Sequence, residues 1–131
     1  MARGSKLVMV PTSQAYPEYR SWWEARKLGA PPPPAIGIFV AHTDYGLISG
    51  ACVFDTSGPL MLLEHFSVSQ KLLRLWKPAA AKTLEHFRRA CVSVNKFPVI
   101  CADRKSLSKV CEAQGFHFTG ARVMLHPMVS T

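Results

Sequence analysis

Residues 35–68 constrain the fold of this chain most strongly, because they hold three apolar runs that are separated by turn residues. Asp, Gly, Ser and Pro in the two intervals are typical of turns between neighbouring antiparallel strands. Runs that are apolar on both faces belong to a sheet that is covered on both sides. The sequence therefore predicts three antiparallel strands, and helices from elsewhere must cover them. In chain order, the strands and turns are Ala35 to Ala41, Thr43 to Gly46, Leu47 to Phe54, Asp55 to Pro59 and Leu60 to Val68.

The flanking segments supply the expected helices and further strands. Leu7 to Val10 is predicted to be a strand, and Tyr16 to Leu28 a helix that Thr12 or Ser13 can cap. This order of elements predicts an α/β fold with helices on both faces of a central sheet. The later elements are a helix over Pro78 to Val94, a strand over Phe97 to Ala102, a helix over Asp103 to Gln114 that Gly115 ends, and a strand over Phe118 to Leu125.

The run Pro31 to Pro34 follows Gly29 and ends the first helix. Four consecutive prolines form a stiff extended connector, and the same run is also a candidate ligand for an SH3-type module. No basic residue flanks the prolines closely in the register that such a ligand needs, which favours the connector.

The length of 131 residues fits one domain over residues 1–131. Apolar residues make up 48% of the chain, and they are spread along it without a run long enough to span a bilayer. Arg3 and Lys6 precede a short apolar stretch that Pro11 interrupts, and no small-residue cleavage site follows. We therefore expect a cytoplasmic protein with no membrane span.

The formal net charge of +8 is carried entirely by the second half of the chain. Residues 1–70 hold five Lys or Arg side chains and five acids, whereas residues 71–131 hold eleven and three. An anionic partner is therefore expected to bind the second half. A phosphorylated cofactor, an acidic protein surface and nucleic acid all fit this field. Nucleic acid is the least favoured, because no reading motif accompanies the cations Lys71, Arg74, Lys77, Lys82, Arg88 and Arg89.

The cysteine spacing argues against a metal site. The chain has four cysteines, with no CxxC pair and no histidine at zinc-ligand spacing. We therefore expect free, mostly buried thiols in a reducing compartment. The cysteines are Cys52, Cys91, Cys101 and Cys111.

Two segments carry a further pattern. The first begins with Glu64-His65-Phe66-Ser67-Val68 and continues through Lys71, Arg74 and Lys77 into Pro78-Ala79-Ala80-Ala81-Lys82-Thr83-Leu84. The second starts at Ser106 and ends in Cys111-Glu112-Ala113-Gln114-Gly115-Phe116. Together they resemble two motifs of the GNAT family of N-acetyltransferases. In that family the fourth strand leads through R/Q-x-x-G-x-G/A into a helix, and a later helix ends in Tyr-x-x-x-Gly-Phe.

The resemblance implies a GNAT-like mixed, mostly antiparallel sheet and a site for acetyl-CoA or coenzyme A. Unsatisfied N–H groups at a helix start, next to cations, form a site for a pyrophosphate. Three alanines keep the residues here small but lose the freedom of glycine at positive φ, and Pro78 removes one donor. In the family, the backbone of the fourth strand also pairs with the pantetheine arm. The expected cofactor-binding residues are Phe66, Ser67, Val68, Arg74, Lys77, Ala79, Ala80, Ala81, Lys82 and Ser106.

Two residues are candidates for catalysis by the same resemblance. Glu64 occupies the position of the general base in many GNAT enzymes, and its alternative is an edge carboxylate paired with His65 or Arg74. Cys111 stands where the family commonly has a tyrosine that protonates the leaving thiolate. A thiol can donate that proton, and Cys111 can equally be a small core residue. The five histidines are scattered and are expected at the surface or in the core.

Three functions follow from these observations. The first is an acyl-CoA-dependent N-acyltransferase that moves an acetyl group to a primary amine of a small molecule or a protein. The second is a GNAT-like binding module with weak or no catalysis that docks on an acidic partner protein through Trp22, Trp23 and Trp76. The third is nucleic-acid binding, which the sequence favours least. The sequence leaves a homodimer open.

Overall fold

The computed structural model describes residues 6–100 and 105–117. Its elements follow the predicted order as far as these residues reach. They are β1 (Leu7–Val10), α1 (Thr12–Ala25), β2 (Ile36–His42), β3 (Gly46–Asp55), β4 (Leu60–Val68), the 3-10 helix η1 (Gln70–Leu75), α2 (Trp76–Ser93), β5 (Phe97–Ile100) and α3 (Lys105–Ala113). The strand predicted over Phe118 to Leu125 lies outside the described residues.

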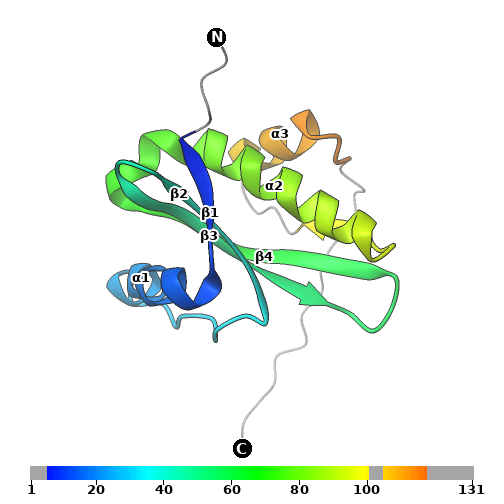
Figure 1. The fold of residues 1–131 in the computed structure, drawn as a ribbon, viewed down its shortest axis with the longest axis horizontal. Helices are drawn as coiled ribbons and strands as arrows, with labels where there is room; N and C mark the ends of the chain where they lie inside the picture. Colours follow the sequence, from blue (N-terminus) through cyan, green and yellow to red (C-terminus); the bar gives the residue numbers. More distant parts are fainter. Residues whose placement is uncertain (1–5, 101–104, 118–131) are drawn as a thin grey trace, which may run out of the picture.

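The described strands form one five-stranded sheet in the order β1-β2-β3-β4-β5. The pairs from β1 to β4 are antiparallel, as predicted for the three central strands, and β4 pairs with β5 in parallel. The sheet is therefore mixed and mostly antiparallel, which confirms the predicted fold class. A parallel pair needs a crossover, and the chain supplies it through η1 and α2 (Figure 1).

Helices cover both faces of this sheet, as the apolar strands require. In Figure 1, α2 and α3 lie on one face and α1 on the other. On the α1 face, Tyr19 packs with Phe39 and Cys52 in one buried cluster. On the α2 face, Leu84 and Phe87 pack against strand residues such as Ile38 in a second cluster. The central strands therefore bury side chains on both faces.

The bounds of α1 and α2 differ from the prediction. α1 begins at Thr12 instead of Tyr16, with Pro11 as its N-cap, and ends at Ala25 instead of Leu28. α2 begins at Trp76 instead of Pro78, because the preceding residues form a 3-10 helix that leads directly into it. The sequence pointed to Pro78 because proline favours the first helical position. In the structure Pro78 still lies in the first turn, where a missing N–H costs little.

Several smaller predictions are confirmed. Gly115 follows the last helix with a φ of +91°, the left-handed conformation expected of a helix stop. Cys52, Cys91 and Cys111 are free, buried thiols, and Cys101 lies outside the described residues.

None of the helices in the described part of the chain is long and apolar enough to cross a membrane.

The packing of α1 on the sheet generates a test of stability. A methyl group at Gly50 would lie 2.5 Å from Cδ1 of Tyr19 and 2.6 Å from Cε1 of Phe39. Gly50→Ala should therefore lower the free energy of unfolding by about 1–3 kcal/mol, as overpacking does. The matched control is Gly29→Ala, because no atom lies within 4 Å of its added methyl group. Urea denaturation measures both, and equal midpoints for the two variants would contradict this packing.

Candidate functional site

β4 contains a β-bulge that interrupts its pairing with β3. Gly50 pairs with Ser67 and Cys52 pairs with Glu64, so one residue of β3 lies opposite two residues of β4. These two are His65 and Phe66, and His65 has a φ of +58°, which is uncommon for a residue other than glycine. Bulges of this kind redirect side chains and are frequent beside active sites. The predicted base Glu64 therefore lies next to a special feature of the backbone.

The bulge is held by the side chains of α1. The hydroxyl of Tyr19, which is fully buried, donates a hydrogen bond of 2.6 Å to the carbonyl oxygen of His65. One helical turn further, the ring of Trp23 contacts the ring of His65 edge-on, with centroids 5.9 Å apart. The guanidinium of Arg26 donates to the hydroxyl of Ser67. Three successive turns of α1 thus contact the backbone and side chains around the bulge.

The bulge places Glu64 and His65 on the same face of the sheet. Glu64 lies opposite Cys52, and Cys52 faces α1. Burial, the contact with Tyr19 and the charge of Glu64 all act on the pKa of the Cys52 thiol. Burial, the largest of these effects, raises the pKa of that thiol. Nε2 of His65 is 3.6 Å from Oε2 of Glu64, and the His65 ring also contacts Phe54 edge-on. Both side chains are partly exposed, so a ligand can reach this carboxylate and imidazole together.

On the opposite face, the pairing of β4 with β5 ends where a small cavity lies. In the described residues the two strands pair only from Leu60 and Phe97 to Leu63 and Ile100. The cavity has a volume of about 20 Å³, enough for one water molecule. β4, β5, α2 and α3 all contribute to its wall. The lining residues are Leu63, Glu64, Phe66, Ala80, Thr83, Leu84, Ile100 and Leu107.

Some of the predicted cofactor residues lie together in the structure, and the others are scattered. Phe66 and Ala80 line the cavity, and Ala79 and Val68 pack in a core cluster with Leu72. Arg74 and Lys77 are exposed at the start of α2, where the guanidinium of Arg74 lies over the ring of Tyr45. The others are Ala81 and Lys82, which are half-buried on α2, Ser67, whose hydroxyl accepts the bond from Arg26, and Ser106, which is exposed on α3.

The structure does not bring the two predicted catalytic residues together. Cys111 is 6% exposed and packs in the core with Leu84 and Phe87 of α2. Glu64, which also contributes to the cavity wall, has its carboxylate beside the imidazole of His65, whose ring contacts Trp23 of α1. Burial raises the pKa of the Cys111 thiol, so this thiol stays protonated at neutral pH.

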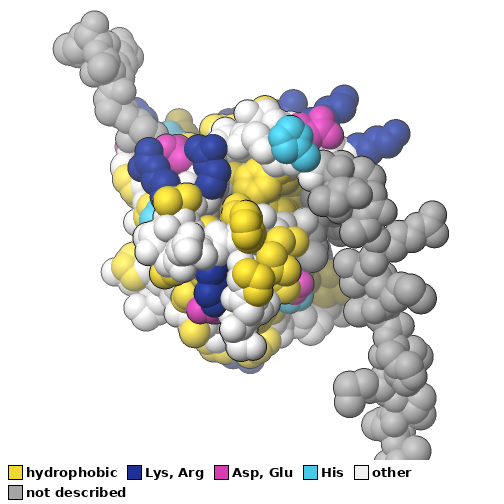
Figure 2. All heavy atoms as spheres, turned by 90° about the vertical axis from the view of Figure 1, so that its right-hand side faces the viewer, with side chains coloured by type: hydrophobic (Ala, Val, Ile, Leu, Met, Phe, Trp, Pro, Cys, Tyr) yellow, Lys and Arg dark blue, Asp and Glu magenta, His cyan; other side chains and the backbone are white. Residues whose placement is uncertain are grey.

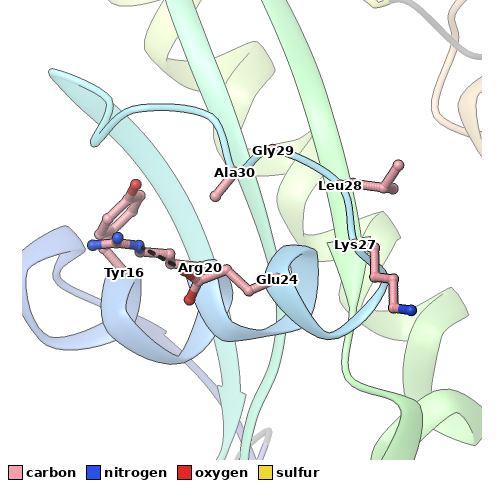
Figure 3. A pocket seen from close by; sticks show the side chains of 7 residues that line it. All are labelled: Tyr16, Arg20, Glu24, Lys27, Leu28, Gly29 and Ala30. Carbon is pink, nitrogen blue, oxygen red and sulfur yellow. Dashed lines mark ion pairs between the residues drawn. The ribbon is translucent and has the colours of Figure 1, made fainter.

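A second hollow, larger than the cavity beside β4, lies on the outer side of α1. It has a volume of about 510 Å³ and is bounded by α1 and the chain that follows it. Figure 3 shows that Arg20 and Glu24 run along the helix as an ion pair, with Gly29 and Ala30 above them. None of the predicted site residues lines this hollow.

The exposed apolar surface also differs from the prediction. Trp22 and Trp23, expected as docking residues, are half-buried against the core cluster under α1. Figure 2 shows apolar side chains on the end of the molecule that faces right in Figure 1. Exposed apolar residues at the end of α2 and the start of β5 include Val92, Val94 and Phe97.

Sequence reasoning missed the residues that shape the bulge. The sequence named His65 as a candidate partner of Glu64, which the separation of 3.6 Å between Nε2 and Oε2 supports, but it gave no sign of the bulge at this residue. Tyr19 and Arg26 gave no signal, because they lie 46 and 41 residues before their partners in β4. Their role depends on how α1 docks on the sheet.

Known proteins resemble this chain in fold but not in sequence. No protein-family model matches the sequence, and no curated protein matches it significantly. An aminoglycoside acetyltransferase from an uncultured soil metagenomic sample, solved with sisomicin, is 11% identical, with 96% of this chain and 95% of that chain covered and a TM-score of 0.56. An aminoglycoside 6'-N-acetyltransferase of Acinetobacter baumannii is 16% identical, with 97% and 100% covered and a TM-score of 0.56.

A third neighbour extends the comparison beyond bacteria. It is an acetyltransferase of Trypanosoma brucei that is 14% identical, with 92% of this chain and 98% of that chain covered and a TM-score of 0.57. The chain thus spans nearly the whole length of each of these enzymes. At such identities the likeness concerns the fold, and the chain has the GNAT-type N-acetyltransferase fold that its two sequence motifs predicted.

Proposed function

We propose that this protein is an acyl-CoA-dependent N-acyltransferase that moves an acetyl group from acetyl-CoA to a primary amine. The observation that supports it most is the junction of β4, β5, α2 and α3. On a GNAT-type fold, the pairing of β4 with β5 ends there beside a cavity, and a partly exposed carboxylate lies on the other face of β4. Acetyl donor and amine acceptor would thus reach β4 from opposite faces.

The start of α2 is the proposed site for the pyrophosphate of the cofactor. Arg74 and Lys77 are exposed there, and their cations can pair with phosphate oxygens. The N–H of Trp76 already donates to the carbonyl oxygen of Leu73 in the preceding 3-10 helix, so the two cations carry this part of the proposal. Ala79 and Ala80 are fully buried, so their smallness serves the close packing of α2 on the sheet.

The pantetheine arm is proposed to run over the cavity beside Phe66 and Val68. A volume of about 20 Å³ does not hold such an arm, so binding would have to widen the gap beyond Leu63 and Ile100, where the strand pairing has ended. The donor supplies an acetyl group on a thioester, which a neutral amine can attack without a covalent enzyme intermediate. Holding the two reactants together would account for much of the rate.

Glu64 is the proposed base that takes the proton of the amine. Its carboxylate is partly exposed on the α1 face, where an acceptor can approach. The leaving thiolate needs a proton, and Cys111 was the candidate donor. The burial of Cys111 in the core supports its alternative role as a packing residue, and the acid role stays a prediction that substitution can test.

The cofactor site makes a prediction about binding. Acetyl-CoA or coenzyme A at about 100 times its dissociation constant should stabilise the fold by about 2.7 kcal/mol, which raises the melting temperature. Lys77→Gln should weaken binding in calorimetry, because it removes a cation at the start of α2. Arg88→Gln is the matched control, since it removes the same charge further along the helix. If millimolar ligand gave no heat and no shift in melting temperature, the proposed cofactor site would be refuted.

The base makes a prediction about turnover. Glu64→Gln should lower kcat by about 10²- to 10⁴-fold, because the amide has nearly the same shape but cannot accept the proton. The affinity for coenzyme A should change little. Glu85→Gln, which removes a carboxylate from α2, should leave kcat near that of the wild type. Undiminished turnover by the Glu64→Gln variant would rule out this base.

The two roles of Cys111 predict opposite results. A packing residue should tolerate Cys111→Ala with a modest loss of stability, whereas Cys111→Tyr should overpack the core and cost about 1–3 kcal/mol. A proton donor should instead lose turnover on Cys111→Ala and keep it on Cys111→Tyr. Urea denaturation and steady-state kinetics on both variants decide between the roles.

A further inference from the structure

The conformation of His65 calls for a physical account, because the backbone adopts φ of +58° in the middle of a strand. A residue with a Cβ persists in this region only where its surroundings hold it there. Here the hydroxyl of the buried Tyr19 donates a hydrogen bond to the His65 carbonyl oxygen. The rings of Trp23 and Phe54 each contact the imidazole ring in an edge-on arrangement. The fold thus holds a histidine in a costly conformation whose effect is to place an imidazole beside Glu64.

From this geometry we propose that His65 is a second proton-accepting group of the acceptor site, working as the partner of Glu64. The inference rests on the proposed acyltransfer. The amine ammonium gives its proton to the carboxylate, the carboxyl passes a proton to the imidazole, and the imidazolium releases it to water. Each step moves one proton, and the three steps together return Glu64 to the carboxylate and His65 to the neutral imidazole.

General proton affinities favour this direction of transfer. A free imidazole has an ordinary pKa about 2 units above that of a glutamate carboxyl, so a proton moves from such a carboxyl to an imidazole with about a hundredfold preference. The separation of 3.6 Å between Nε2 and Oε2 is longer than a hydrogen bond, so a small side-chain rotation or one bridging water completes the path. Both groups are partly exposed, which gives the imidazole access to solvent.

The imidazole sets the sign of the pH dependence, because the thiol and the phenol beside the pair carry no charge at neutral pH. Arg26 and Tyr19 face the region from α1, and Cys52 faces it from β3. Burial raises the pKa values of both Tyr19 and Cys52, so these two stay neutral at neutral pH. A protonated imidazole can accept no proton, so turnover should be lower in acid than at neutral pH.

The test is chemical rescue in a variant that keeps the backbone. Glycine adopts positive φ freely, so His65→Gly should preserve the bulge and leave space for a free imidazole. We expect kcat to fall about tenfold or more, added imidazole to restore it in a saturable way, and the KM for acetyl-CoA to stay unchanged. His65→Asn also tolerates this conformation but fills part of the space, so it should lose turnover with weaker rescue.

The pH profile gives the second readout. The ratio of wild-type to His65→Gly turnover on the same amine cancels the titration of the substrate, and it should rise from acid to neutral pH, because only a neutral imidazole accepts a proton. If the wild type is active and the His65→Gly variant keeps full turnover or is not rescued by imidazole, the proposed role of His65 is wrong. The proposed acyltransfer is not affected by that result. A wild type that binds acetyl-CoA but acetylates no amine overturns the proposed function, and this inference with it.

Discussion

The hydrogen bond from Tyr19 to the carbonyl of His65 is the interaction on which the proposed site depends. The donor end is shielded by packing, since Tyr19 is fully buried and its ring contacts Phe39 edge-on at 5.3 Å. A buried donor left without its acceptor would cost about 1–3 kcal/mol, so this bond ties the docking of α1 to the bulge in β4. Gly50 allows the tyrosine ring to approach the sheet closely enough to make it.

The bulge divides β4 into two faces with different chemistry. Glu64 and His65 point toward α1, whereas Phe66 and Val68 pack under α2. A regular strand would alternate strictly, and Glu64 and His65 would then lie on opposite faces. The extra residue brings a carboxylate and an imidazole together on one face. It also keeps the apolar residues that follow in contact with the core, because the alternation resumes after the bulge.

The sequence predicted the strands well because their pattern is local. Leu60 to Val68 has the same bounds in the prediction and in the structure, and Gly115 ends the last helix as expected. The start of α2 was misplaced because the segment Gln70 to Leu75 has no helical periodicity of its own, and its 3-10 turn depends on packing through Leu72. The strand predicted over Phe118 to Leu125 lies outside the described residues.

The candidate site was predictable only in part. Glu64 and the residues at the start of α2 came from motifs, which are local in sequence. The bulge, the anchor Tyr19 and the orientation of His65 depend on a contact across 46 residues, which no local pattern contains. The burial of Cys111 likewise follows from where α3 packs on α2.

The most direct test of the account is amide hydrogen exchange of the whole chain with and without coenzyme A. The account predicts new protection at Phe66 to Val68 and over the first turn of α2, because the bound cofactor would cover both segments. The outer side of α1, around Arg20 and Glu24, should exchange at the same rate in both samples. Protection confined to that hollow, or no change at saturating coenzyme A, would contradict a cofactor site between β4, β5 and α2.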